Sequence, residues 1–265
     1  MDRPEDGIAG DLRSADPGRR LGALERLLAS ASAVPAALVD ALAACVGDPS
    51  KAVQRRAADA LARIADRGVV RAALTPMLRD ADARRRWGAA YALGVAVGPE
   101  ASLLPIFLEV LGDDDGDRRW AAAELVSALG RRDETIGAAL LGLAGSTNPR
   151  QRKMALYCLR DLGRQGDAAE AAARGGLGDA DAAVRLAALS LAKRCARPEA
   201  LVDAVVGVLD RDPDAGVRRA AAATLGSWRH LAVAAGALER VAQSGDASLR
   251  RAAAQALQCR EGPPR

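Results

Sequence analysis

Seven residues whose side chains could bind a partner or do chemistry gather in one stretch of this 265-residue chain: Trp87, Tyr91, Trp120, Glu124, Lys153, Tyr157 and Arg160. Four of them are aromatic, in a chain with three tryptophans, two tyrosines and one phenylalanine. Clustered aromatic side chains usually mark an interaction site when they are exposed, and the lysine, arginine and glutamate give this cluster charged flanks. The pattern predicts a binding surface, provided that the fold turns these side chains to solvent.

Motifs of the common catalytic and metal sites are missing from the sequence. There is no GxxxxGK[ST], HExxH or GxSxG motif, and the formal net charge of +4 permits an acidic partner without requiring one. The single histidine, His230, and the four cysteines lie far apart, without metal-ligand spacing: Cys45, Cys158, Cys195 and Cys259. We therefore expect the cysteines to be small buried side chains, with no metal and no cofactor. These absences favour a binding protein over an enzyme.

A repeat of 32 or 33 residues must position the seven residues. The frame of DPSKAVQRRAADAL (48–61) recurs along the chain, with a degenerate first copy in DPGRRLGALERLL (16–28). The position of Leu61 recurs at Leu28, Leu93, Val126, Leu159, Ala192, Leu225 and Leu257. Such a period indicates stacked helix pairs. We expect an all-α, right-handed α-solenoid of about eight stacked antiparallel helix pairs, a single domain over residues 1–265 with irregular ends at about 1–15 and 260–265.

The second helix of each pair follows a common plan. It begins at a preferred N-cap residue: Ser50, Asp82, Asp115, Asn148, Asp181, Asp214 or Asp246. If Val53 is position 0 and Leu61 is position 8, positions 0, 4, 5 and 8 form the buried stripe, and position 4 is alanine in seven copies. Position 1 is arginine in six copies: Arg86, Arg119, Arg152, Arg185, Arg218 and Arg250. We expect these arginines to form a structural ladder with the aspartates of the turns.

Positions 2, 6 and 9 lie opposite the buried stripe. Trp87, Trp120 and Lys153 occupy position 2, Tyr91, Glu124 and Tyr157 occupy position 6, and Arg160 occupies position 9. We therefore expect the four aromatic side chains to be at least partly exposed in one groove. Phe107 and Trp228 lie elsewhere in the pattern and are expected to pack in the core.

The motif D-P-x-x-x-V-R-x-x-A-A-x-A-L, nearly intact at residues 212–225, resembles short HEAT-type repeats of the phycobilisome-lyase class. The resemblance covers roughly residues 10–259 and implies that the second helices line a concave groove and that an arginine–aspartate ladder joins the pairs. Proteins with such repeats include scaffolds, lyases, DNA glycosylases and hydroxylases. The paired His-Glu metal ligands of the hydroxylases have no counterpart in this sequence.

The resemblance leaves several functions open. The first is a non-catalytic scaffold or adaptor that binds a protein or peptide in the groove. An alternative is a HEAT-like DNA-binding protein or alkylpurine DNA glycosylase, in which Glu124 would stabilise positive charge on the sugar, Trp87 and Trp120 would pack against the nucleoside, and Lys153 or Arg152 would hold phosphate. A bilin-lyase-like chaperone is the second alternative. Because no signal peptide and no apolar run of about 18 residues occurs, we expect a cytoplasmic monomer with no membrane partner.

Overall fold

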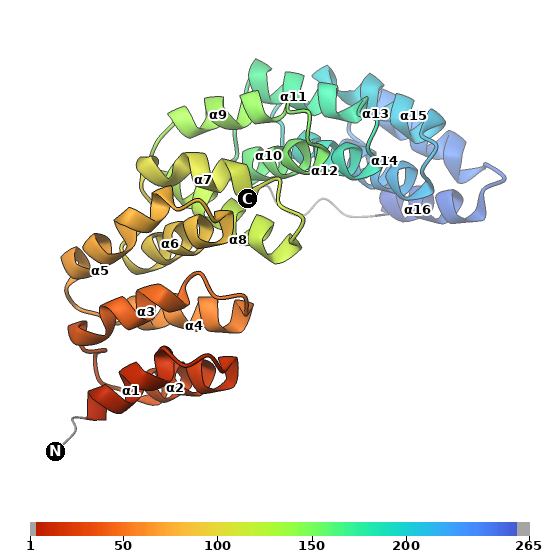
Figure 1. Ribbon diagram of the computed structural model, residues 1–265. Coiled ribbons are helices and arrows are strands. Elements are labelled where there is room, and N and C mark those ends of the chain that lie inside the picture. Colours follow the sequence, from red (N-terminus) through yellow and green to blue (C-terminus); the bar gives the residue numbers. More distant parts are fainter. Residues whose placement is uncertain (1–3, 259–265) are drawn as a thin grey trace. The chain divides into compact units, whose positions relative to one another are not determined.

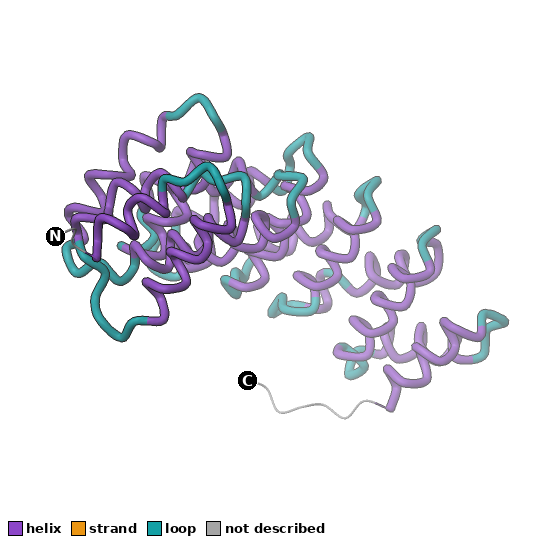
Figure 2. The backbone as a smooth tube through the Cα atoms, turned by 60° about the horizontal axis from the view of Figure 1, so that its bottom comes forward, coloured by secondary structure: helices purple, strands orange, loops and turns teal. Residues whose placement is uncertain are grey.

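The chain is all-helical over residues 4–258, the part that this computed structural model describes. Figure 2 shows helices joined by short loops, and no β-strand occurs in the described range. The first helices of the pairs are α1 (Pro4–Leu12), α3 (Val39–Cys45), α5 (Arg67–Leu74), α7 (Leu104–Val110), α9 (Thr135–Leu143), α11 (Asp167–Leu177), α13 (Val202–Arg211) and α15 (Ala232–Ala242). The second helices are α2 (Pro17–Ala29), α4 (Lys51–Leu61), α6 (Ala83–Ala96), α8 (Gly116–Gly130), α10 (Pro149–Asp161), α12 (Ala182–Ala192), α14 (Ala215–Ser227) and α16 (Ala247–Gln258). Four 3-10 segments precede or extend first helices: η1 (Ala36–Leu38), η2 (Thr75–Arg79), η3 (Ala101–Leu103) and η4 (Pro198–Ala200).

These helices confirm the predicted fold of stacked helix pairs. Helix α1 lies in the N-terminal segment that was expected to be irregular, and it is the first helix of the first pair. The C-terminal end expected to be irregular, residues 260–265, lies outside the described residues.

The pairs group into two compact units. Unit 1 comprises residues 1–110 and 115–129, and unit 2 comprises residues 111–114 and 130–265. In unit 2 the odd-numbered helices form one row and the even-numbered helices form a second row beside it (Figure 1). Helix α12 packs between α10 and α14, and α14 packs on α16. In unit 1, α4 packs between α2 and α6 in the same way.

Small side chains permit this close packing of second helices. The alanines at position 4 are completely buried: Ala57, Ala89, Ala122, Ala155, Ala188, Ala221 and Ala253. Cys45, Cys158 and Cys195 are also buried, as predicted, and burial raises the pKa of the Cys45 thiol to about 11. Cys259 lies outside the described residues.

The turn before a second helix carries two polar residues: one accepts a hydrogen bond within the turn, and the other caps the helix. In α12, the Asp181 carboxylate accepts hydrogen bonds from the backbone N–H groups of Ala183 and Val184, so it caps the helix. Asp179, two residues earlier, accepts from the Asp181 N–H and so braces the turn. The predicted caps at Asp82, Asp115, Asn148, Asp214 and Asp246 accept the same kind of bond. Ser50 stands at the N-cap of α4, but its side chain makes no capping hydrogen bond.

The arginine at position 1 joins one pair to the next. Arg185 donates through Nη1 to the carbonyls of Asp179 and Ala180 in its own turn, at 2.8 and 3.0 Å. Its Nε and Nη2 bind both carboxylate oxygens of Asp212, the first residue of the next turn, at 2.7 and 2.9 Å. Both side chains of this pair are less than 10% exposed. A bidentate, buried arginine–carboxylate pair therefore holds α12 to the turn that precedes α14.

The same contacts recur with variations along the chain. Arg152 binds Asp179 in the bidentate manner, at 2.7 and 2.8 Å. Arg218 reaches the N-cap carboxylate of Asp246 at 3.3 Å, because serine replaces aspartate at the first position of the last turn. Arg86 pairs with Glu109 of α7, Arg119 is half-buried in α8, and Arg250 donates to the Ser244 carbonyl.

The degenerate first copy also carries a ladder arginine, Arg20, which the repeat pattern does not predict. Arg20 donates to the carbonyls of Ser14 and Ala15 and binds Asp48 at 2.6 Å, so Arg20 occupies position 1 of α2. Leu27, not Leu28, is then the buried residue at position 8. The assumed constant period placed this copy one residue out of register.

The ladder should contribute strongly to stability. We expect Arg185→Ala to lower the free energy of unfolding by about 3 kcal/mol, because it leaves the buried Asp212 carboxylate without its partner. The matched control is Arg250→Ala, where an exposed arginine donates a hydrogen bond to the Ser244 carbonyl and binds no buried carboxylate, and the expected loss is about 1 kcal/mol or less. Denaturation with guanidinium chloride measures both changes. If the two variants lost the same free energy of unfolding, the Arg185–Asp212 pair would have no special structural role.

Acid should weaken the ladder. The guanidinium of Arg152, by hydrogen bonding, holds the pKa of the Asp179 carboxyl below its ordinary value. A carboxyl with a depressed folded-state pKa stabilises the fold above its unfolded pKa of about 3.9, and this contribution disappears as the pH falls through the folded value. In urea denaturation, the deficit of Asp179→Asn relative to wild type should be largest at neutral pH and shrink below about pH 4. Asp203→Asn, at an exposed position, should follow wild type throughout.

Candidate functional site

Trp87 is a core residue, and the expectation that it is exposed is wrong. Only 4% of its surface is accessible. Its ring packs edge-on against the buried ring of Phe107 in α7, with centroids 6.3 Å apart and planes at 79°. Tyr91 lies one turn further along α6, with its ring centroid 5.5 Å from that of Trp87. The tryptophan thus anchors α6 to α7 instead of facing solvent.

A change in the orientation of α6 explains the error. Position 0 is a buried valine in α4, α12 and α14, but in α6 it is Arg85, which is exposed and pairs with Asp80 at 2.9 Å. In α6, positions 2 and 3, Trp87 and Gly88, are buried, whereas the same positions of α4, Arg55 and Arg56, are exposed. Gly88 allows this approach, because a Cβ atom there would lie 1.9 Å from the carbonyl oxygen of Val46. Arginine at position 0 followed by glycine at position 3 is the sequence signal that could have predicted the rotation.

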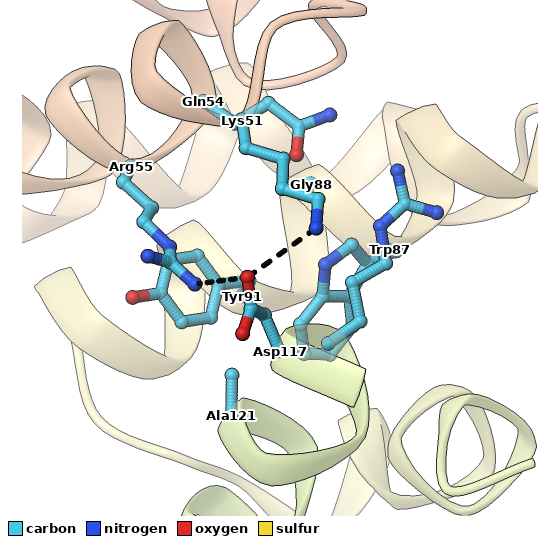
Figure 3. A pocket seen from close by; sticks show the side chains of 9 residues that line it. Lys51, Gln54, Arg55, Trp87, Gly88, Tyr91, Asp117 and Ala121 are labelled. Atoms are coloured by element: carbon cyan, nitrogen blue, oxygen red, sulfur yellow. Dashed lines mark hydrogen bonds and ion pairs between the residues drawn. The ribbon is translucent and has the colours of Figure 1, made fainter. Parts of the chain in front are cut away.

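A small pocket lies where α6 comes close to its neighbours. Its walls are Lys51, Gln54 and Arg55 from α4, Trp87, Gly88 and Tyr91 from α6, and Asp117, Arg118 and Ala121 from α8 (Figure 3). Its volume of about 20 Å³ suits one water molecule, which needs roughly 10–15 Å³ by the same measure. In this structure the pocket is therefore too small for a nucleobase or a tetrapyrrole.

Ion pairs close the pocket by joining α4 to α8 across α6. The Lys51 ammonium lies 2.5 Å from Asp115 and 3.3 Å from Asp117, and the Arg55 guanidinium lies 3.6 Å from Asp117. Figure 3 shows the Asp117 carboxylate between these two cations. The Lys51 ammonium, by hydrogen bonding, lowers the pKa of the Asp115 carboxyl. Of these four residues, the repeat pattern placed only Arg55 on the groove face. The pattern predicts no contact between helices two repeats apart, such as that of Lys51 in α4 with Asp117 in α8.

The exposed side of the second helices of unit 1 carries apolar and charged groups together. We call this surface the unit 1 face and define it by Arg55, Asp59, Tyr91, Val95, Trp120 and Glu124. Trp120 is 48% exposed and Val95 is 40% exposed, while Tyr91 is half-buried. Burial raises the pKa of the Tyr91 phenol, and the carboxylates of Asp59 and Glu124 raise it further. The predicted site residues Tyr91 and Glu124 are thus close together, with Trp120 one turn before Glu124 on α8.

The remaining predicted site residues lie on α10 in unit 2. Arg160 stacks on Tyr157, with the guanidinium carbon 4.8 Å from the ring centroid. It also donates to Asp161 at 2.7 Å and to the Ser190 hydroxyl of α12 at 2.9 Å. Lys153, one turn before Tyr157, is half-buried. Arg160 therefore covers one face of the Tyr157 ring and links two neighbouring second helices.

The two remaining aromatic residues lie in the core. Phe107 and Trp228 are buried, as predicted. Within residues 4–258, no group of three or more His, Cys, Asp or Glu side chains could hold a metal ion. No helix in that range combines the length and the apolar character needed to cross a bilayer.

Comparisons with known proteins find similarity to one family. A family model for HEAT repeats matches residues 36–127 and 171–258, more than half of the chain. The solved structure of YibA from E. coli is similar over 97% of this chain and 93% of YibA, with 17% identity and a TM-score of 0.58. The karyopherin Kap121p, bound to the extreme C-terminus of the protein phosphatase Cdc14p, is similar over 95% of this chain and 32% of Kap121p, with 14% identity and a TM-score of 0.65. No curated protein sequence matches the chain. The phycobilisome-lyase class is not distinguished by these matches.

The close approach at Gly88 can be tested by adding one methyl group. We expect Gly88→Ala to destabilise the fold by about 1–3 kcal/mol or more, because backbone atoms at Val46 must move to admit the Cβ. The matched control is Gly236→Ala in the middle of α15, where no atom lies within 4 Å of the new Cβ. Alanine there should stabilise the helix by up to about 1 kcal/mol. Thermal unfolding that ranks the two variants in the opposite order would contradict the packing described for α6.

Proposed function

The chain belongs to the HEAT-repeat proteins, and on this premise we propose that it is a non-catalytic scaffold or adaptor that binds a protein or peptide partner. The binding surface in this proposal is the unit 1 face. Of the predicted site residues, Tyr91, Trp120 and Glu124 lie on this face, whereas Trp87 is buried beneath it in the core.

The exposed apolar side chains of the unit 1 face carry this proposal. Within the described residues, the large hydrophobic side chains that are exposed are Val95, Trp120 and Val233. Two of these three belong to the unit 1 face: Val95 lies one turn after the half-buried Tyr91 on α6, and Trp120 lies on α8. Tryptophan and tyrosine are enriched among the residues that dominate binding energy at protein interfaces, especially where charged groups surround them. Arg55, Asp59 and Glu124 supply both signs of charge at the edge of this surface.

A solved relative of the same fold gives a precedent for a peptide ligand. Kap121p has been seen with the extreme C-terminus of a protein phosphatase bound to it. At 14% identity the likeness is one of fold, and the precedent supports a protein segment as the class of partner.

Two observations weigh against the nucleotide and tetrapyrrole alternatives. A glycosylase of the expected kind needs both Trp87 and Trp120 against the nucleoside, and Trp87 is packed against Phe107 instead. The pocket beside Tyr91 has a volume of about 20 Å³, which suits a water molecule and not a flat ring system. A protein surface does not need such a cavity, because it can bind an exposed anchor residue directly.

Substitution of the exposed tryptophan tests the proposal. We expect Trp120→Ala to weaken capture of a stoichiometric protein partner by about 2 kcal/mol or more, a loss of about thirtyfold, while the melting temperature changes little. The control Val233→Ala removes an exposed apolar side chain from α15 and should bind like wild type. Trp87→Ala should instead lower the free energy of unfolding by about 3–5 kcal/mol.

Two results would overturn the proposed function. One is a Trp120→Ala variant that retains full affinity for every partner captured by wild type. The other is excision of alkylated bases from DNA by the wild-type chain together with loss of that activity in Glu124→Gln, which keeps the shape of the side chain and removes its charge.

A further inference from the structure

We propose that the exposed side of the second helices of unit 2 binds an extended, acidic protein segment. We call this surface the unit 2 face and define it by Lys153, Arg160, Leu186, Lys193, Arg219 and Arg251. The inference rests on the proposed function, because it assumes that the chain binds protein, and it adds the chemistry of the partner and a second place for it.

The unit 2 face carries positive charge and no acidic side chain at positions 2, 6 and 9, while Asp161 at position 10 of α10 pairs with Arg160. Positions 2, 6 and 9 of α10, α12, α14 and α16 contain five cationic residues and no aspartate or glutamate. The unit 1 face differs, because Asp59 and Glu124 occupy position 6 of α4 and α8. Both faces come from the same repeat, so the charge of the unit 2 face is not a requirement of the fold.

Three of these cations are available for a ligand. Lys193, Arg219 and Arg251 are exposed and form no ion pair with any residue in the described range. Arg251 donates only through Nε to the carbonyl of Ala247 in its own helix. The ladder arginines of the same helices, Arg185 and Arg218, are engaged with Asp212 and Asp246. On α12 and α14 the arginines at position 1 therefore form structural ion pairs, whereas the cations at positions 2 and 9 are exposed to solvent.

The spacing of the face defines the length of the segment. Packed helices lie about 10 Å apart, so four second helices span roughly 30 Å. An extended chain advances about 3.3 Å per residue, so about three residues cover one helix and about ten residues cover the face. An acidic residue at about every third position would then meet the cations at position 2 of α10, α14 and α16. Leu186 occupies position 2 of α12 and is half-buried, so an apolar residue of the segment fits opposite it.

These features fit a protein segment better than a nucleic acid. Single-stranded nucleic acid is usually held by bases stacked on open aromatic rings and by dense contacts to successive phosphates. Tyr157 is the only aromatic residue at positions 2, 6 and 9 of these four helices, and Arg160 covers its ring at 4.8 Å. Cations separated by about 10 Å match the spacing of acidic residues in a peptide more closely than the phosphates of a strand.

Binding of a defined probe tests the inference on the full-length chain. The probe is a fluorescent peptide of about ten residues, with aspartate at the first, seventh and tenth positions, leucine at the fourth and glycine or serine elsewhere. Its control has asparagine in place of each aspartate, and a single-stranded oligothymidine of similar length serves as the nucleic-acid probe. We expect anisotropy to report binding of the aspartate peptide that weakens as salt rises from about 50 to 200 mM.

Charge reversal on and off the face locates the binding. Arg219→Glu combined with Arg251→Glu should weaken the aspartate peptide by about tenfold or more, since each exposed ion pair is replaced by repulsion. Arg131→Glu combined with Arg132→Glu changes the net charge equally, at exposed residues between α8 and α9, and should leave the affinity within about twofold. Circular dichroism of both double variants should match wild type.

Distinct results would overturn the inference. If both double variants lost the same affinity for the peptide, binding would depend on net charge and not on the unit 2 face. If the oligothymidine bound more tightly than the peptide, the face would be a nucleic-acid-binding surface. No binding of the aspartate peptide, with capture of a protein partner still dependent on Trp120, would reject the unit 2 face and leave the proposed function intact.

Discussion

The arginine at position 1 of the second helix is the contact on which the rest of the architecture depends. One planar guanidinium binds two backbone carbonyls of its own turn and a carboxylate of the next, as Arg185 does with Asp179, Ala180 and Asp212. Turn carbonyls at the ends of packed helices need a donor, and a buried carboxylate needs a cation. Five N–H donors in a rigid fork satisfy both at once, which a lysine could not do.

The paired polar residues of each turn complete this arrangement. Asp179 braces its turn and receives Arg152 from the preceding pair, while Asp181 caps α12. Where the pattern changes, the contacts change with it. Gln54 stands at position 1 of α4 and binds the Asp48 carbonyl, and the turn residue Asp80 pairs instead with Arg85 of α6, the helix that follows its own turn. Within each unit, neighbouring pairs are thus joined by contacts such as Arg20–Asp48 and Arg185–Asp212, as expected of a repeat protein whose stability comes from nearest-neighbour interfaces.

Because the ladder and the alanines at position 4 maintain the stack, the exposed side of the second helices is free to vary. The unit 1 face combines exposed Trp120 and Val95 with charges of both signs, and the half-buried Tyr91 packs on the ring of Trp87 one turn earlier on α6. The unit 2 face is basic, with a single half-buried leucine among its cations. One repeated backbone thereby presents two chemically different surfaces.

The sequence alone determined the helix pairs, their capping residues and the buried alanine stripe, because these features depend on local spacing that is repeated in almost every copy. It also identified Arg152 and Arg185 and the turn aspartates that they bind, Asp179 and Asp212, since both residue types recur at fixed positions. Only the tertiary structure decided the environment of Trp87, because the rotation of α6 depends on how Arg85, Gly88 and Phe107 pack against neighbouring helices. The register of Arg20 and the ion pairs of Lys51 across α6 were likewise settled in three dimensions. Helical periodicity specifies the direction of a side chain on an ideal helix, whereas burial depends on the rotation that the neighbouring elements impose on that helix.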